Sequence, residues 1–387
     1  MKKEFSEPRG APAWPSSPSW QARSMSATLR LFVRRRSWGR DAGALARRAR
    51  LLFGAPWPYQ WLRTRGLHVR AANEGGVRGE WLEPARAGGV EDGHGVGVEI
   101  GGVGEGIGGG GIRGGVFDSV RGAGGVAGGV GGVAGGAGVE GRVGVEGGGV
   151  ILYLHGGGYV SCSPATHRPV SAALARLTAR RVFSLDYRLA PEHRYPAALD
   201  DALAAYEWLL ARVGVPASAI CIAGDSAGGG LVLGCLLRAR DAGVALPACA
   251  VCFSPWTDLA GAGASVRAND GRCAMFRTEN IEEFAAAYLP AGASPRDPYA
   301  SPAHADLRGL PPLLLQVGST EILLDDARIV HEKIQATGGA SRLEIYEDLP
   351  HGWQMLDGFV PEARFALRQA ASFIREHLPD AGGASKF

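Results

Sequence analysis

The chain has 387 residues, a formal net charge of +3 and 60 glycines. This length suits one α/β domain with a cap and additional segments, and the small net charge argues against nucleic acid as a partner. The six cysteines do not have the spacing of a disulfide framework. Cys249 and Cys252 form a C-x-x-C pair inside an apolar run, where residues three apart point to opposite faces of a sheet, so we expect buried thiols and no metal site.

The N-terminal part divides into two segments by composition. Residues 1–24 are rich in Pro and Ser and are predicted to be a disordered extension, and Met25 is a candidate for the true start of the protein. Residues 25–65 carry many arginines and few acids among Leu, Phe and Val, which predicts amphipathic helices that belong to a cap. A transit peptide and a helix with weak contact to a membrane surface are the alternatives. No apolar stretch reaches ~18 residues and no secretory hydrophobic region is present, so we expect a cytoplasmic protein.

Early strands are predicted within residues 66–87, and a glycine-rich segment follows over residues 88–149. About half of that segment is glycine, which loses the most backbone entropy on folding, and few large side chains offset the loss. We therefore predict a low-complexity, disordered insertion. It contains a G-x-G-x-x-G pattern at Gly104, Gly106 and Gly109, but no strand precedes it and no helix follows, so a dinucleotide site is not expected.

Apolar runs alternate with helical patterns through residues 150–378. This alternation predicts an α/β fold, with a mostly parallel, doubly wound sheet covered by helices on both faces. A further contribution to the cap is expected at about residues 263–310, and residues 379–387 form a tail. The strand-like runs cover residues 150–154, 181–186, 219–223, 248–253, 312–317 and 342–347.

Residues 224–229 read Gly-Asp-Ser-Ala-Gly-Gly and match the G-x-S-x-G nucleophile elbow. The motif lies between an apolar strand-like run and a helix-like run, which is the setting that it requires. Small neighbours allow the strained turn that exposes a serine hydroxyl above the sheet. Ser226 is therefore the candidate nucleophile.

A second glycine-rich motif, His-Gly-Gly-Gly-Tyr at residues 155–159, directly follows the first apolar run of the core. A glycine loop can turn its backbone N–H groups toward the charge that develops on a substrate carbonyl, which makes an oxyanion hole. We expect Gly156 and Gly157 to be the loop donors. The N–H of Ala227, next to the nucleophile, is the third.

With these two boxes the chain resembles the hormone-sensitive-lipase family of α/β-hydrolases, and residues 186–192, 254–258 and 351–353 extend the resemblance. The similarity runs from about residue 150 to residue 378 and extends weakly upstream to Met25. It implies an α/β-hydrolase fold with a helical lid over the acyl pocket, to which residues 25–65 and about 263–310 would contribute. It also implies a serine triad, an acyl-enzyme intermediate and hydrolysis of short to medium acyl esters. Tyr159 and Trp353, which stand within these segments, are expected to contact the substrate.

The order Ser, acid, His of α/β-hydrolases narrows the choice of the other two triad residues. His351 stands in a Leu-Pro-His-Gly loop after a strand-like run and is the expected base. The family usually has Asp in a D-x-L-x-[DE] box, and in the same register this chain has Glu321, with Asp325 as the trailing acid. Glutamate is an accepted triad acid. We expect Glu321 to orient His351, with Asp325 and then Asp258 as the alternatives.

The sequence thus predicts a serine esterase that needs no cofactor or metal and acts on a small-molecule ester. An amidase or deacetylase that acts on an N-acetylated metabolite is the alternative enzyme. A non-catalytic small-molecule receptor is the alternative from another functional class, and it is disfavoured because Ser226 and His351 are both present. The natural substrate and assembly as a homodimer stay open at this point.

Overall fold

The computed structural model describes residues 17–36, 38–39, 41–54, 58–85 and 149–378, which all belong to one compact unit. Residues 1–16 of the predicted N-terminal extension lie outside the described residues. The same holds for the predicted glycine-rich segment, except Gly149, and for the tail at residues 379–387.

One sheet runs through the described part of the chain, with the strand order β1-β2-β4-β3-β5-β6-β7-β8. The first two strands form an antiparallel hairpin that pairs antiparallel with β4, and the remaining strands are parallel. This arrangement confirms the predicted mostly parallel α/β sheet. The strands are β1 (Leu67–Glu74), β2 (Val77–Pro84), β3 (Val150–Leu154), β4 (Arg181–Leu185), β5 (Ile220–Asp225), β6 (Cys249–Phe253), β7 (Leu313–Gly318) and β8 (Ser341–Tyr346).

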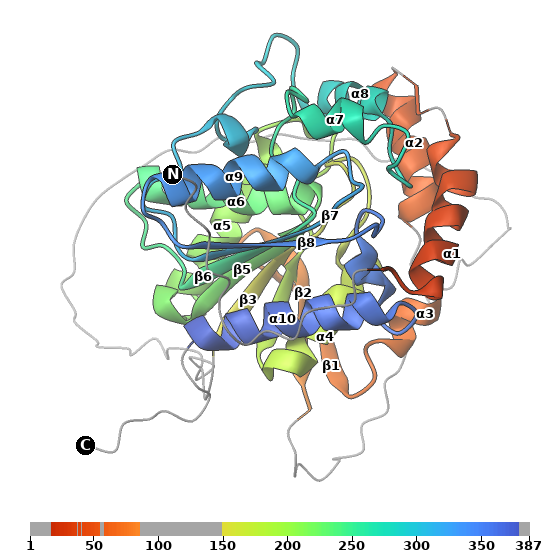
Figure 1. Cartoon of the computed structure of the whole chain (residues 1–387). Helices are drawn as coiled ribbons and strands as arrows, with labels where there is room; N and C mark the ends of the chain where they lie inside the picture. Colours follow the sequence, from red (N-terminus) through yellow and green to blue (C-terminus); the bar gives the residue numbers. More distant parts are fainter. Residues whose placement is uncertain (1–16, 37, 40, 55–57, 86–148, 379–387) are drawn as a thin grey trace, which may run out of the picture. The chain divides into compact units, whose positions relative to one another are not determined.

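Helices cover both faces of this sheet (Figure 1). The side chains of β3 alternate between them: Ile151 and Tyr153 join a core cluster with α4 and α10, while Leu152 and Leu154 join one with α5, α6 and α9. All five residues of β3 are buried, as expected for a strand that is covered on both sides. These helices are α4 (Arg168–Thr178), α5 (Ala197–Ala211), α6 (Ala227–Asp241), α9 (Leu324–Ala336) and α10 (Pro361–His377).

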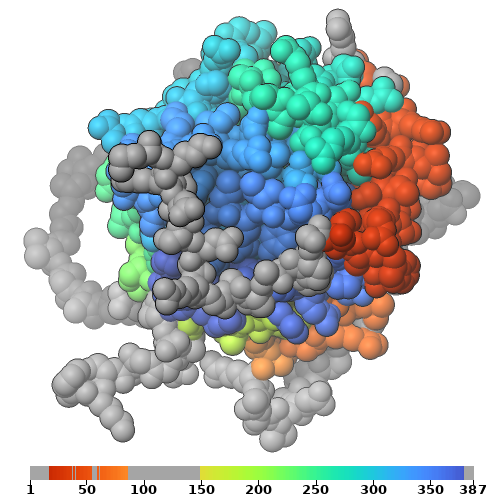
Figure 2. Space-filling model, viewed as in Figure 1, coloured from red at the N-terminus to blue at the C-terminus, as the bar shows by residue number. Residues whose placement is uncertain are grey.

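The remaining helices form the lid, in two parts that are far apart in the sequence. Helices α2 and α8 contact each other, and Figure 2 shows the red N-terminal helices beside the teal α7–α8 segment. The predicted lid contributions thus lie together at one end of the sheet (Figure 1). The lid helices are α1 (Trp20–Leu29), α2 (Ala42–Phe53), α3 (Pro58–Leu62), α7 (Ala264–Ala268) and α8 (Thr278–Tyr288).

The predicted boundary of the N-terminal extension at residue 24 is wrong, because α1 already begins at Trp20. Its N-cap is Ser19, whose hydroxyl accepts a hydrogen bond from the Ala22 N–H. The Ser19 N–H and hydroxyl in turn donate to the carboxylate of Glu362 in α10, at 2.5 and 2.8 Å. This tertiary contact fixes the start of the helix. The Pro- and Ser-rich composition of the segment gives no sign of such a contact, so the predicted boundary lies too late in the chain.

Candidate active site

Ser226 occupies a sharp turn between β5 and α6, with φ 53° and ψ −122°. Glycines make this turn sterically feasible. A Cβ at Gly224 would lie 2.6 Å from the Gly228 carbonyl oxygen, and one at Gly228 would lie 2.0 Å from the Leu154 carbonyl oxygen. The strained backbone is held because the Ser226 N–H donates to the Phe253 carbonyl at 2.8 Å. The predicted strand, elbow and helix are therefore present around the serine.

His351 lies in the loop after β8 and faces Glu321, which follows β7. Its Nδ1 is 2.6 Å from Glu321 Oε2, so Nδ1–H donates to the carboxylate and Nε2 is left to accept a proton. The other oxygen, Oε1, accepts from the Ser254 hydroxyl at 2.7 Å and from the Gly318 N–H at 2.6 Å. With Glu321 only 1% exposed, these three donors fix the carboxylate in place.

The alternative acids contact other groups. Asp325, in the first turn of α9, accepts from the Ser265 N–H at 2.8 Å and pairs with Arg328. Asp258 accepts from two backbone N–H groups of its own loop and lies 2.8 Å from His304. Of the three acids considered from the sequence, the structure brings Glu321 to His351.

The glycine loop after β3 differs from the sequence expectation at one position. The Gly156 N–H donates to Asp225 Oδ1 at 3.0 Å, so it is already engaged and the expectation that it serves an oxyanion is wrong. Gly157 and Gly158 instead line the cavity, with φ of +110° and +62°. Within the described residues no acceptor binds the N–H of either glycine, nor that of Ala227 at the start of α6.

The two residues expected to contact the substrate lie in the hydrophobic core instead. Tyr159 is 2% exposed, and its ring stacks on Tyr288 with centroids 3.8 Å apart. Trp353 is fully buried and packs against Tyr346 at 5.0 Å. Both expectations are wrong for the same reason, because adjacency to a motif residue does not fix the direction of a side chain.

Ser226 and His351 line one cavity of about 710 Å³ beneath the lid. The nucleophile, the glycine loop, Glu321 and His351 follow β5, β3, β7 and β8, so they meet at the carboxyl ends of parallel strands. Among the described residues no cluster of His, Cys, Asp or Glu could hold a metal ion. The cavity wall is mainly apolar and includes Leu29, Val33, Phe53, Phe276, Ile281, Phe284, Leu323, Met355, Leu356 and Phe359.

Sequence reasoning missed one lid residue that contacts the site. Arg50, in α2, donates from Nε to the Val160 carbonyl at 2.9 Å, just after the glycine loop. Its guanidinium also binds the carboxylate of Glu192, and this hydrogen bond raises the pKa of the arginine. Arg50 thereby ties the lid to the loop. The only signal in the sequence was one arginine among many in residues 25–65.

Comparisons with known proteins agree with this fold and site. Residues 151–355 match a protein family described as alpha/beta hydrolase fold. An acetyl-hydrolase of Streptomyces hygroscopicus is 46% identical over 225 residues, which are 58% of this chain and 75% of the relative. An esterase of Acinetobacter venetianus is 37% identical and covers 58% of this chain and 74% of its own length.

Solved structures are similar over most of the chain. An esterase/lipase from an uncultured bacterium has a TM-score of 0.70 at 31% identity and covers 93% of this chain and 99% of its own. An esterase from the bacterial hormone-sensitive lipase family has a TM-score of 0.69 at 32% identity, and it covers 94% of this chain and 100% of its own. The chain therefore belongs to the hormone-sensitive-lipase-like family of α/β-hydrolases.

Proposed function

We propose that this protein is a serine esterase that hydrolyses carboxylic esters through Ser226, His351 and Glu321. The observation that carries the proposal is that His351, which is hydrogen-bonded to Glu321, lines the same cavity as Ser226 on its nucleophile elbow. The family and the activities named for its relatives support the same reaction class.

The reaction follows from the roles that each group can take. His351 Nε2 accepts the Ser226 proton as the oxygen attacks the ester carbonyl, and Glu321 stabilises the resulting imidazolium. The N–H groups of Gly157, Gly158 and Ala227 are the donors that we assign to the oxyanion. His351 then protonates the leaving alcohol, and water releases the acid from the acyl-enzyme by the reverse proton transfers.

The cavity favours uncharged substrates with short to medium acyl chains. Its lid side is formed by aliphatic and aromatic side chains from α1, α2 and α8. A charged acyl group would lose its hydration there without a compensating partner. Phe276, which contacts the His351 ring edge-on with centroids 5.1 Å apart, limits the space beside the base.

The test is turnover of p-nitrophenyl acetate and butyrate by the wild type and by Ser226→Ala. We expect the substitution to abolish turnover with little change in Tm, because the hydroxyl is exposed to the cavity rather than packed. Near-wild-type rates in the variant would contradict the assignment of the nucleophile. Parallel assays with N-acetylated amines measure the alternative amidase or deacetylase activity, and ligand binding without turnover by the wild type would favour a receptor.

We also infer that the lid contacts an anionic membrane surface weakly. Residues 17–65 contain eleven arginines and one acid, Asp41. Large apolar side chains stand exposed among them, with Trp20 69%, Phe32 58% and Leu51 83% exposed. Exposed aromatic and basic residues together suit the interface of an anionic bilayer. In the part of the chain that the structure describes, no helix is long and apolar enough to cross a membrane.

A further inference from the structure

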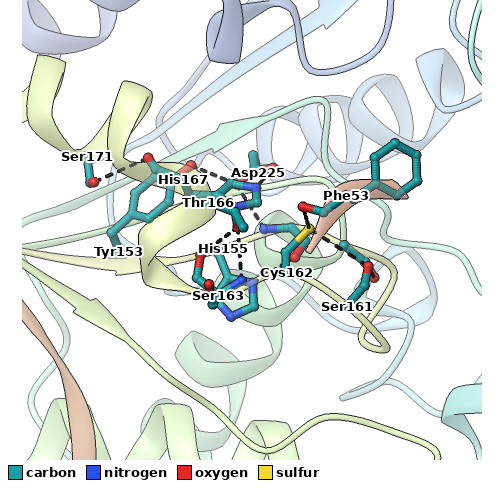
Figure 3. Close-up of polar contacts among 12 residues, drawn as sticks. Phe53, Tyr153, His155, Ser161, Cys162, Ser163, Thr166, His167, Ser171 and Asp225 are labelled. Carbon is teal, nitrogen blue, oxygen red and sulfur yellow. Dashed lines mark hydrogen bonds and ion pairs between the residues drawn. The ribbon is translucent and has the colours of Figure 1, made fainter. Parts of the chain in front are cut away.

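Asp225, the residue before the nucleophile, has its carboxylate buried against the glycine loop. It is 5% exposed and accepts hydrogen bonds from the Tyr153 hydroxyl at 2.6 Å and the Gly156 N–H at 3.0 Å. Its other oxygen lies 3.2 Å from His167 Nε2 (Figure 3). A buried carboxylate is costly unless each oxygen has a donor, and here both oxygens have one.

The carboxylate of Asp225 leaves no space for a side chain at the first glycine of the loop. A Cβ at position 156 would lie 2.3 Å from Asp225 Oδ2, closer than any side chain could tolerate. Asp225 therefore holds the start of the loop by close packing as well as by a hydrogen bond. Gly157 and Gly158, the donors assigned to the oxyanion, follow directly in the chain.

His167, at the start of α4, holds the carboxylate from the other side. It is 5% exposed, and its Nδ1 lies 2.9 Å from the Thr166 hydroxyl (Figure 3). Whichever of these two groups donates, Nε2 faces a carboxylate and must carry a proton to donate to it. The Thr166 carbonyl accepts from Gln60 Nε2 of α3 at 2.7 Å, so the network reaches from the lid to the nucleophile.

Charge and burial agree with an Asp225 that is ionised at neutral pH. Burial alone would raise its pKa, but the facing His167 and the hydrogen bonds from His167 and Tyr153 outweigh that effect, and the pKa lies below its ordinary value. An ionised carboxylate accepts stronger hydrogen bonds than a neutral one.

Thr166, His167 and Asp225 form one polar wall of the mainly apolar cavity. The Thr166 hydroxyl lies 2.7 Å from the Ser163 carbonyl as well as 2.9 Å from His167 Nδ1, and His167 Nε2 contacts Asp225. Because these polar atoms are already bonded within the protein, we do not expect this wall to be the part of the cavity that recognises a polar substrate. Its arrangement instead fixes the position of the backbone.

We propose that Asp225 is a positioning residue that sets the place of the oxyanion donors relative to Ser226, with Tyr153 and His167 holding Asp225 in turn. The inference rests on the proposed esterase function. Asp225 is joined to the nucleophile by one peptide bond and to the glycine loop by one hydrogen bond. The same carboxylate therefore fixes the two halves of the site against each other, which transition-state stabilisation requires.

Two substitutions test the proposal. Tyr153→Phe removes one donor to Asp225 and keeps the ring, and Asp225→Asn places an amide opposite His167 Nε2–H. We expect kcat for p-nitrophenyl butyrate to fall by about tenfold or more in each, short of the ~10²–10³ that loss of a whole oxyanion donor costs. KM should stay within about twofold, because the loop acts on the transition state rather than on ground-state binding.

A trifluoromethyl ketone supplies the second measurement. Ser226 Oγ adds to the carbonyl carbon of this inhibitor, and the π electrons of the carbonyl move onto its oxygen, which becomes an oxyanion. His351 takes the serine proton. Affinity for this inhibitor should fall by the same factor as kcat/KM. The matched control is Tyr206→Phe, which removes a buried hydroxyl that donates to the Ala245 carbonyl in another part of the fold. We expect it to lower Tm without changing kcat or inhibitor affinity.

The outcomes separate this inference from the proposed function. An active wild type whose Tyr153→Phe and Asp225→Asn variants behave like Tyr206→Phe would overturn the positioning role alone. A raised KM with unchanged kcat would also overturn it, since the wall would then bind substrate. If the Asp225→Asn variant does not fold, the kcat and inhibitor affinity of Tyr153→Phe alone test the positioning role. A wild type without ester turnover would contradict the proposed function itself.

Discussion

The acid that faces His351 is a glutamate, whose side chain is one methylene longer than that of an aspartate. Three contacts hold it: the His351 ring, the Ser254 hydroxyl and the Gly318 N–H. The last two reach the same oxygen, Oε1, and leave Oε2 to the imidazole. Such an arrangement restricts the carboxylate to one position, which is what a residue that orients a catalytic base must have.

Glu321→Gln should therefore reduce kcat by orders of magnitude with little change in KM. The amide cannot stabilise an imidazolium, and the comparable Asp→Asn change in a serine protease costs about 10⁴. Glu321→Asp should give an intermediate rate, because the charge remains but the reach is shorter. The measurement is steady-state turnover of p-nitrophenyl butyrate.

Asp325→Asn is the matched control for that experiment. It alters an acid four positions away that contacts Ser265 and Arg328. We expect less than a tenfold loss of rate, from a helix-end effect of ~0.3–1 kcal/mol on stability. An inactive Asp325→Asn variant beside an active Glu321→Gln variant would move the triad acid to Asp325.

Residue-level prediction from sequence succeeded where a motif dictates the local backbone. The elbow around Ser226 needs its glycines whatever surrounds it, and the fold follows from apolar runs of strand length. Prediction failed for Gly156, Tyr159 and Trp353. Their positions in the motifs were evident, but an N–H already bonded to Asp225 or a ring packed into the core depends on residues far away in the sequence.

At the scale of elements, the inner side of the lid is hydrogen-bonded to the rest of the fold, whereas its outer side is exposed. Inward-pointing groups such as Arg50 and Val33 contact the loop and the cavity. On the outside, Trp20 and Leu51 are exposed, and the segment that carries them is rich in arginine. The composition of residues 25–65 predicted the lid, but the tertiary cap at Ser19 that starts α1 earlier could not be seen in it.

We expect the wild type to cosediment with phosphatidylglycerol vesicles at low salt and to be released at high salt. Each arginine near an anionic surface contributes about 1 kcal/mol, and salt screens this attraction. The double variant Trp20→Ser/Leu51→Ser should bind less, while turnover of soluble p-nitrophenyl acetate stays unchanged.

Ile345→Ser is the matched control, because it removes an exposed apolar side chain from β8, outside the lid. It should bind vesicles as the wild type does. Equal binding by all three proteins, or binding that salt does not affect, would exclude the lid as a membrane contact.

At the scale of the whole molecule, folding buries polar groups beneath the glycine loop. His155 is fully buried, and its ring stacks on Tyr187 with centroids 4.2 Å apart. Its Nδ1 lies 2.7 Å from the Gly156 carbonyl, whereas Nε2 is buried without a hydrogen-bond partner among the described residues. Burial, and then the neighbouring His167, lower the pKa of His155 to about 3.

This lowered pKa predicts a loss of stability on acidification. In the unfolded chain His155 binds a proton below its ordinary pKa of about 6.5, whereas in the folded chain it stays neutral until about pH 3. Between these values the unfolded state binds more protons, so the free energy of unfolding falls as the pH falls. One such group contributes a slope of up to about 1.4 kcal/mol per pH unit. Buried carboxylates with lowered pKa, such as Asp225, add to the loss only at more acidic pH.

The variants His155→Phe and His155→Gln distinguish the contribution of His155 to the pH dependence of stability from that of the carboxylates. Phenylalanine keeps the stacking on Tyr187, glutamine keeps a donor for the Gly156 carbonyl, and neither titrates. Urea unfolding measured from pH 7 to pH 5 should give a steeper loss of stability for the wild type than for both variants, whatever their stability at pH 7. The difference should reach about 2 kcal/mol across this range if His155 is the group that resists protonation. Parallel curves for all three proteins would mean that the His155 ring is protonated in the folded state despite its burial.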